Sequence, residues 1–155
     1  MPMNEITLIS HVLFGMGCIL TTLWIFVDVL HANAANLPRI RSMCRASAVV
    51  MWLAFLIGGY WYVSFYKVDK ALILQGPWPF AHNFIMETKE HLVITLLLVV
   101  TYLPIAAAGD LVADKGARHV LLWTTGLAAV LALVMDLEGG LIALGVKVAS
   151  HTNPL

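Results

Sequence analysis

Four long apolar stretches follow one another along the 155-residue chain, and few charged residues interrupt them. Each stretch has roughly the 17 to 25 residues that a helix needs to cross a hydrocarbon core about 30 Å thick. Short segments with Asn, Gly and Pro separate them and suit turns. The pattern predicts four transmembrane helices, over residues 6–30, 42–66, 82–108 and 119–146.

The four predicted helices take up most of the chain, so we expect a single domain over residues 1–155. Hydrophobic residues make up 61% of the sequence and charged residues 12%, whereas an ordinary soluble domain carries about 25% charged residues. The remaining loops leave no room for a separate soluble catalytic module. The fold class predicted is therefore all-α, an integral membrane four-helix bundle.

Charge and local motifs exclude several classes of function. The formal net charge is zero, which argues against nucleic acid as a partner because that would call for a basic patch. No glycine-rich nucleotide loop, nucleophile elbow or HExxH motif occurs, so catalysis as a stand-alone enzyme is not predicted. The cysteines Cys18 and Cys44 show no disulfide or CxxC pattern.

The distribution of Lys and Arg predicts the orientation in the membrane. In the four-helix topology five basic residues fall on one side and four on the other. The positive-inside rule then places the side with five in the cytoplasm and both termini outside. The two sets are Arg39, Arg41, Arg45, Lys115 and Arg118 against Lys67, Lys70, Lys89 and Lys147.

Ionisable residues within membrane helices are costly and mark candidate functional sites. The first and third helices enter from the outer face and the fourth returns to it, so five such residues share one depth: His11, Glu87, His91, Asp136 and Glu138. We therefore expect any chemistry to lie in this outer layer.

The two histidines of that layer suit a b-type haem, because haem iron takes one axial nitrogen from each side of the ring. We predict His11 and His91 as these ligands, for one haem or for the first of two. Gly15 lies four residues after His11 on the same helical face, where a small residue would admit a flat macrocycle. A small residue there equally suits plain helix packing.

The other histidines leave alternatives open. His82 is an alternative ligand to His91 on the third helix. His31 and His119 lie at the opposite, cytoplasmic ends of their helices, where they are either interface residues or ligands of a second haem.

The carboxylates suggest a competing site. Glu87 and His91 are four residues apart and share a helical face. With His11, Asp136 and Glu138 they would furnish mixed oxygen and nitrogen ligands for iron, zinc or copper, or a path for protons. The alternative is that the charged turn around Glu87 is solvated and that Asp136 and Glu138 mark where the fourth helix leaves the hydrocarbon.

Several short features together resemble a known family. They are His11 followed by Asp28, the pair Gly58–Gly59, the histidine at the start of the third helix, and the closing run Gly139–Val148. The chain is similar over most of its length to small bacterial four-helix membrane proteins of uncharacterised function that are predicted to bind haem b, although it lacks their His-Pro pair. The resemblance implies a cytochrome-b-like electron carrier in the bacterial cytoplasmic membrane, with His11 and His91 at the matching positions.

We therefore expect a haem b electron-transfer protein that is one subunit of a larger redox complex. It would pass electrons between a quinone or another membrane donor and an extracytoplasmic redox subunit. Two alternatives remain: a metal-ion or proton-handling membrane protein that uses the histidines and carboxylates, and a structural membrane subunit without a cofactor.

Overall fold

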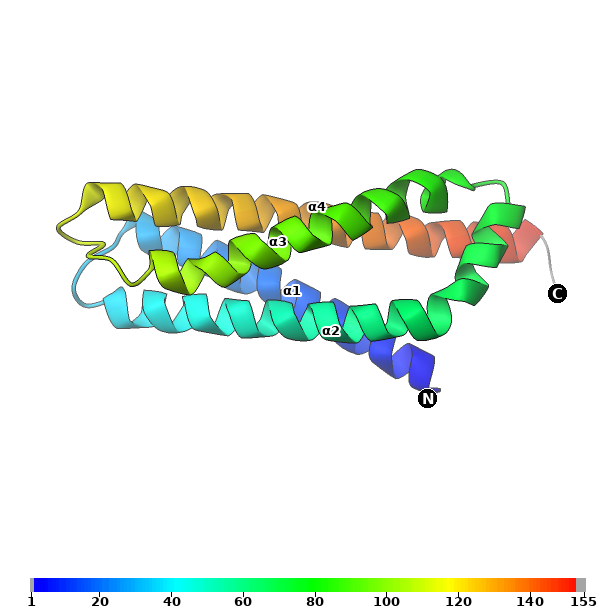
Figure 1. Ribbon diagram of the computed structural model, residues 1–155, viewed down its shortest axis with the longest axis horizontal. Helices are drawn as coiled ribbons and strands as arrows, with labels where there is room; N and C mark the ends of the chain where they lie inside the picture. Colours follow the sequence, from blue (N-terminus) through cyan, green and yellow to red (C-terminus); the bar gives the residue numbers. More distant parts are fainter. Residues whose placement is uncertain (1, 153–155) are drawn as a thin grey trace.

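In the computed structural model, which describes residues 2–152, every regular element is a helix. The all-α prediction is confirmed for this range. The helices in chain order are α1 (Met3–Leu30), α2 (Leu37–Gln75), the short π-helix η1 (Ala81–Met86), α3 (Glu87–Ala106) and α4 (Lys115–Thr152) (Figure 1).

Four segments of the described range are long and apolar enough to cross a membrane: Met3–Leu30, Leu37–Gln75, Ala81–Ala106 and Lys115–Thr152. The shortest has 26 residues and so extends about 39 Å at 1.5 Å per residue. Large apolar side chains cover the outside of the bundle, and Trp123 is 77% exposed. Such a surface is matched to lipid rather than to water.

The second helix extends beyond the predicted range 42–66 at both ends. It starts at Leu37, because Pro38 suits a first helical turn. It continues to Gln75, because the charged residues after Tyr66 reduce hydropathy without opposing helix formation. Gly76, followed by a proline, ends it.

The helices form a bundle in which α2 and α4 each pack against both α1 and α3. Within residues 2–152, α1 and α3 share no contact and lie diagonally opposite each other. Figure 1 shows the α1–α2 and α3–α4 turns, residues 31–36 and 107–114, at one end, which we call the loop end. The start of α1, residues 76–80 and the end of α4 lie toward the other end, which we call the open end (Figure 1).

A seam of buried residues runs along each helix in alternating steps of four and three residues. This spacing keeps one side of each helix facing the bundle axis. The seam residues of α1 are Cys18, Thr22, Ile25 and Val29; those of α2 are Ile40, Cys44, Ser47, Met51 and Ala54; those of α3 begin with Leu96, Val100 and Leu103; and those of α4 include Leu121, Thr125, Ala128, Ala132 and Met135.

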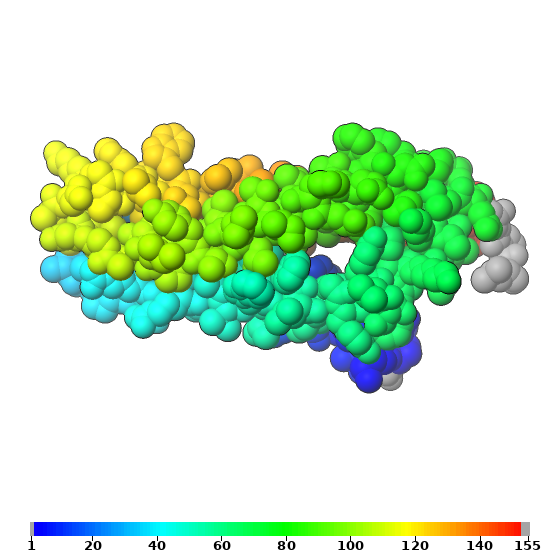
Figure 2. All heavy atoms as spheres, in the orientation of Figure 1, coloured from blue at the N-terminus to red at the C-terminus, as the bar shows by residue number. Residues whose placement is uncertain are grey.

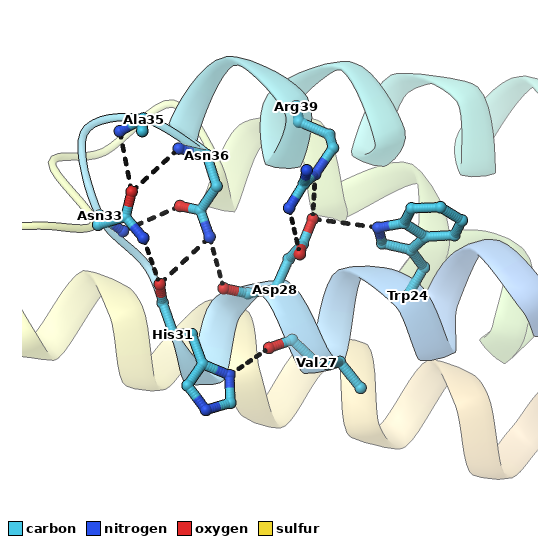
Figure 3. Close-up of polar contacts among 8 residues, drawn as sticks. All are labelled: Trp24, Val27, Asp28, His31, Asn33, Ala35, Asn36 and Arg39. Carbon is cyan, nitrogen blue, oxygen red and sulfur yellow. Dashed lines mark hydrogen bonds and ion pairs between the residues drawn. The ribbon is translucent and has the colours of Figure 1, made fainter.

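A polar network joins α1 to α2 at the loop end (Figure 3). The guanidinium of Arg39 donates two hydrogen bonds of 2.8 Å to the carboxylate of Asp28, and the indole of Trp24 donates a third at 3.2 Å. In the turn, Asn36 and Asn33 donate side-chain hydrogen bonds to backbone carbonyls at the end of α1. These bonds satisfy carbonyls that a helix end leaves without partners.

Two further arginines cap helix ends at the loop end. Arg41 of α2 donates to the carbonyl of Ala107 at 3.0 Å, where α3 ends. Arg118 of α4 donates to the carbonyl of Val29 at 2.9 Å and to that of Leu30, where α1 ends. A cation at a helix C-terminus also interacts favourably with the helix dipole, so the loop end is joined by charge as well as by apolar packing.

Candidate functional site

Three ionisable residues occupy seam positions toward the open end, and we call His11, Lys89 and Glu138 the polar layer. His11 lies seven residues before Cys18 on α1, and Lys89 lies seven residues before Leu96 on α3. Residues seven apart share one face of an α-helix. Glu138 continues the buried face of α4 and is itself only 7% exposed. The spacing that builds the apolar core therefore also directs these three side chains inward.

His11 is half-buried against α2, and its Nδ1 lies 2.8 Å from the carbonyl oxygen of Ala54. Because a carbonyl can only accept, Nδ1 carries the hydrogen, and in the neutral ring Nε2 is left as the acceptor. Gly58 makes this position possible, since a Cβ there would collide with Nδ1. The imidazole is thus held by the α2 backbone with Nε2 available for a proton or a metal.

Lys89 reaches from α3 to α4, where its Nζ donates to the carbonyl of Met135 at 2.9 Å. Gly139 makes room for the ammonium, because a Cβ there would lie 2.8 Å from Nζ. The charges of Glu138 and Asp136 both act on Lys89. Lys89 is therefore a half-buried cation beside two carboxylates of the facing helix.

Glu138 is the least satisfied member of the polar layer. Its Oε2 is buried and has no hydrogen-bond partner. A buried carboxylate without full pairing costs several kcal/mol, so a residue of this kind persists where function retains it. Asp136, two residues earlier on α4, is exposed and lies off the seam.

A second polar group lies next to the layer, and we call it the tyrosine–histidine cluster: Tyr62, Tyr66, His82, Glu87 and Glu90. Tyr66 and His82 are 2% and 3% exposed, and a hydrogen bond of 3.1 Å joins Tyr66 Oη to His82 Nδ1. The ring of Tyr62 stacks on Tyr66 at 5.1 Å, and its hydroxyl donates to Glu90 at 2.5 Å. On the other side of His82, Nε2 lies 4.0 Å from Oε1 of the exposed Glu87.

The structure does not bring His11 and His91 together. His91 follows Lys89 by two residues, so it points away from the buried face of α3; it is exposed, and its Nδ1 lies 2.6 Å from the Glu87 carbonyl. Only His11 faces the bundle axis. The exposure of His91 lends no support to an iron held by both histidines, and haem b stays a prediction.

The remaining predicted site residues are dispersed. His31 and His119 are exposed near the loop end, and Nδ1 of His31 lies 3.2 Å from the carbonyl of Val27. Gly15 is half-buried, and a Cβ there would meet nothing within 4 Å, so open space adjoins it. Across residues 2–152 no group of three or more His, Cys, Asp or Glu side chains is placed to hold a metal ion. The predicted metal site around Glu87, Asp136 and Glu138 is thus not assembled there.

Two residues that the sequence analysis did not select prove central to the site. Lys89 entered only the count of basic residues, and Tyr66 was not singled out. The step of seven from Leu96 back to Lys89 is the signal that would have placed Lys89 on the axis. Mean hydropathy does not reveal that Lys89 faces inward, because a charged turn has the same mean hydropathy whether it faces water or the bundle axis.

Comparison with known proteins does not add to this picture. No protein-family model matches the chain, and no curated protein or solved structure is significantly similar to it. The resemblance to the haem b family stays a prediction. The function therefore has to be inferred from the polar layer and its surroundings.

Proposed function

We propose that this chain is an integral membrane protein that takes up and releases protons at the polar layer. The observation that carries the proposal is Glu138, a buried carboxylate with an unpartnered oxygen beside the Lys89 ammonium. When Glu138 is ionised, its negative charge balances the positive charge of Lys89. When Glu138 is protonated, it is neutral and leaves the charge of Lys89 unbalanced. His11, with Nε2 as an acceptor, offers a second proton site in the same layer.

The proton site opens to one side of the membrane only. Between the polar layer and the loop end, all four helices lack Asp, Glu, Lys, Arg and His, over residues 12–27, 46–66, 92–109 and 120–135. His11 precedes Asp28 by 17 residues, which corresponds to about 26 Å along α1. A seam of that length without Asp, Glu, Lys, Arg or His is a barrier to protons, so the protein binds protons near one face rather than conducting them across.

We place the loop end in the cytoplasm and the open end outside, in a bacterial cytoplasmic membrane. Arg39, Arg41, Arg45 and Arg118 lie at or near the loop end, where the positive-inside rule predicts basic residues. The polar layer then faces the outer aqueous phase, close to the outer limit of the hydrocarbon.

The test is infrared spectroscopy of the protein in liposomes while the external pH is changed. We expect a carbonyl band from a protonated carboxylic acid, and this band should disappear in Glu138→Gln. It should persist in the control Asp136→Asn, because Asp136 is an exposed carboxylate on the same part of α4. A pH-sensitive dye inside the vesicles should respond no faster than in empty vesicles. An unchanged band in Glu138→Gln would overturn the proposal and favour a structural subunit, and a dye response would overturn its one-sidedness.

Electron transfer through haem b is a second candidate, favoured by His11 alone. Donation of its Nδ1–H to the Ala54 carbonyl is the arrangement that typically orients a metal-bound histidine. Such a carrier would serve a quinone and a redox subunit. A reduced-minus-oxidised visible spectrum of the purified protein, with His11→Ala and His91→Ala variants, tests it. A haem spectrum that both variants abolish would support this candidate, and a featureless spectrum from haem-replete cells would exclude it.

A further inference from the structure

The π-helix η1 gives the start of the third span two differently directed polar faces. His82 and Lys89 are seven residues apart and would share a face in a regular α-helix. A π-turn advances each residue by a smaller angle, which rotates the residues before it relative to those after it. Accordingly His82 contacts α2 through Tyr66, whereas Lys89 contacts α4 through Met135.

This rotation directs His82 toward α2, where the tyrosine–histidine cluster forms at the start of the third span. Glu87 is exposed, and its carboxylate faces His82. At the other side of the cluster, Glu90 directly follows Lys89 in the chain. Tyr62 follows by one helical turn the glycine that contacts His11. The cluster therefore begins at the exposed Glu87, and two of its members lie on the helices that hold the layer: Glu90 beside Lys89 in the sequence, and Tyr62 one turn after Gly58.

We propose that the tyrosine–histidine cluster is the route by which protons pass between the outer aqueous phase and the polar layer. The inference rests on the proposed function and names its access path. Figure 2 shows an opening in the surface where α2 turns away from α3, with atoms of α1 visible at its edge. In the proposed route, bridging water would complete the link between Tyr66, Tyr62 and the layer. The charges of Lys70 and Asp69 also act on His82 and Tyr66, respectively.

The side chains of this route have the chemistry that proton relay requires. An imidazole accepts a proton at one nitrogen and releases another proton from the second nitrogen. In this relay a proton from Glu87 binds His82 Nε2, and the Nδ1 proton passes to the Tyr66 hydroxyl oxygen as that hydroxyl releases its own proton to a bridging water. Each group returns to its starting form when it re-orients, so the step needs no oxidant or reductant.

The experiment is a pH jump outside liposomes that contain the full chain, followed by time-resolved infrared detection of the Glu138 band. Tyr66→Phe and His82→Gln remove relay groups with little change in volume. Glu87→Gln alters the entry at an exposed position that folding does not depend on. We expect all three to slow protonation by about tenfold or more, with the final amplitude unchanged. His91→Gln, which is exposed and off the route, should keep the wild-type rate.

Wild-type rates in Glu87→Gln and Tyr66→Phe would overturn the route while leaving the proton site intact. Absence of the Glu138 band in the wild-type protein would instead overturn the proposed function, so the two failures are distinguishable. If Tyr66→Phe or His82→Gln lowers thermal stability in detergent, Glu87→Gln decides the outcome by itself.

Discussion

The two ends of the bundle are built on different principles. At the loop end the axis is filled by apolar side chains with no exposed surface, among them Ile25, Val29 and Leu121, and arginines cap the helix ends. At the open end the same seam carries His11, Lys89 and Glu138, and Figure 2 shows an opening between α2 and α3. Stability is concentrated where the seam is apolar, and chemistry where it is not.

This contrast shows that the same spacing of inward-facing residues builds both the apolar core and the polar layer. Alternating steps of four and three bring any side chain to the axis, whether it is isoleucine or glutamate. At the loop end the charged residues lie off the axis and neutralise helix ends. At the open end they lie on it, where each needs a neighbouring helix for its partner. The polar layer should therefore cost stability that the loop end supplies.

The largest expected effect comes from making the open end resemble the loop end. The double variant Lys89→Met, Glu138→Met replaces the two inward-facing charges of the polar layer with apolar side chains of similar length. Replacing even a buried ion pair by apolar residues is often neutral or stabilising, by up to about 4 kcal/mol, and we expect higher stability with loss of the proton-binding band. Reversible unfolding in mixed micelles measures it. A clear loss of stability would show that the polar layer contributes to folding.

The next effect comes from weakening the loop end. Asp28→Ala removes the acceptor of Arg39 and Trp24 and should destabilise the bundle by about 1–2 kcal/mol, because Arg39 is partly solvated. The matched control is Asp136→Ala at the open end, an exposed carboxylate, for which we expect a change within about 0.5 kcal/mol. Equal losses in the same unfolding assay would contradict the assignment of stability to the loop end.

A neighbouring pair of glycines isolates the packing of His11. In Gly58→Ala the new methyl group would meet the imidazole, so we expect about 1 kcal/mol of destabilisation or more and a displaced His11. Gly59 has nothing within 4 Å of a Cβ, so Gly59→Ala should be neutral or slightly stabilising, because alanine favours helix. Unfolding and the NMR signal of the His11 ring report the two effects. If Gly59→Ala destabilises the protein more than Gly58→Ala does, the His11 ring does not lie against Gly58.

The smallest effect concerns pH at the loop end. The amides of Ala113 and Val112 donate to the Asp110 carboxylate at 3.0 and 3.1 Å, and these bonds hold its pKa below the ordinary value. A carboxyl with a lowered folded-state pKa stabilises the turn above its unfolded pKa of about 4, and the contribution is lost as pH falls through the folded value.

Amide hydrogen exchange at Val112 and Ala113 therefore should quicken, relative to the intrinsic rate, as the pH falls into the acid range. Asp110→Asn keeps the acceptor but cannot titrate, so its protection should not depend on pH. A wild-type protection that stays constant with pH would contradict the role of the Asp110 charge.

The sequence by itself determined that the chain forms four helices of membrane-spanning length, because apolar run length sets helix length in a bilayer. It also predicted that five ionisable residues share one depth: His11, Glu87, His91, Asp136 and Glu138. It placed the end of α2 too early, because polarity in Lys67 and Asp69 resembles a loop although both residues are compatible with a helix.

Only the tertiary structure decided which of those ionisable residues form a site. Lys89 and His91 have nearly the same depth, yet one faces α4 and the other is exposed. Depth follows from position along the chain, whereas direction follows from the phase of each helix, and two residues turn an α-helix by more than half of a full circle. The rotation of each helix about its own axis is set by packing against neighbouring helices and, in the third span, by the π-turn at Ala81–Met86. The sequence of one helix taken alone does not specify that rotation.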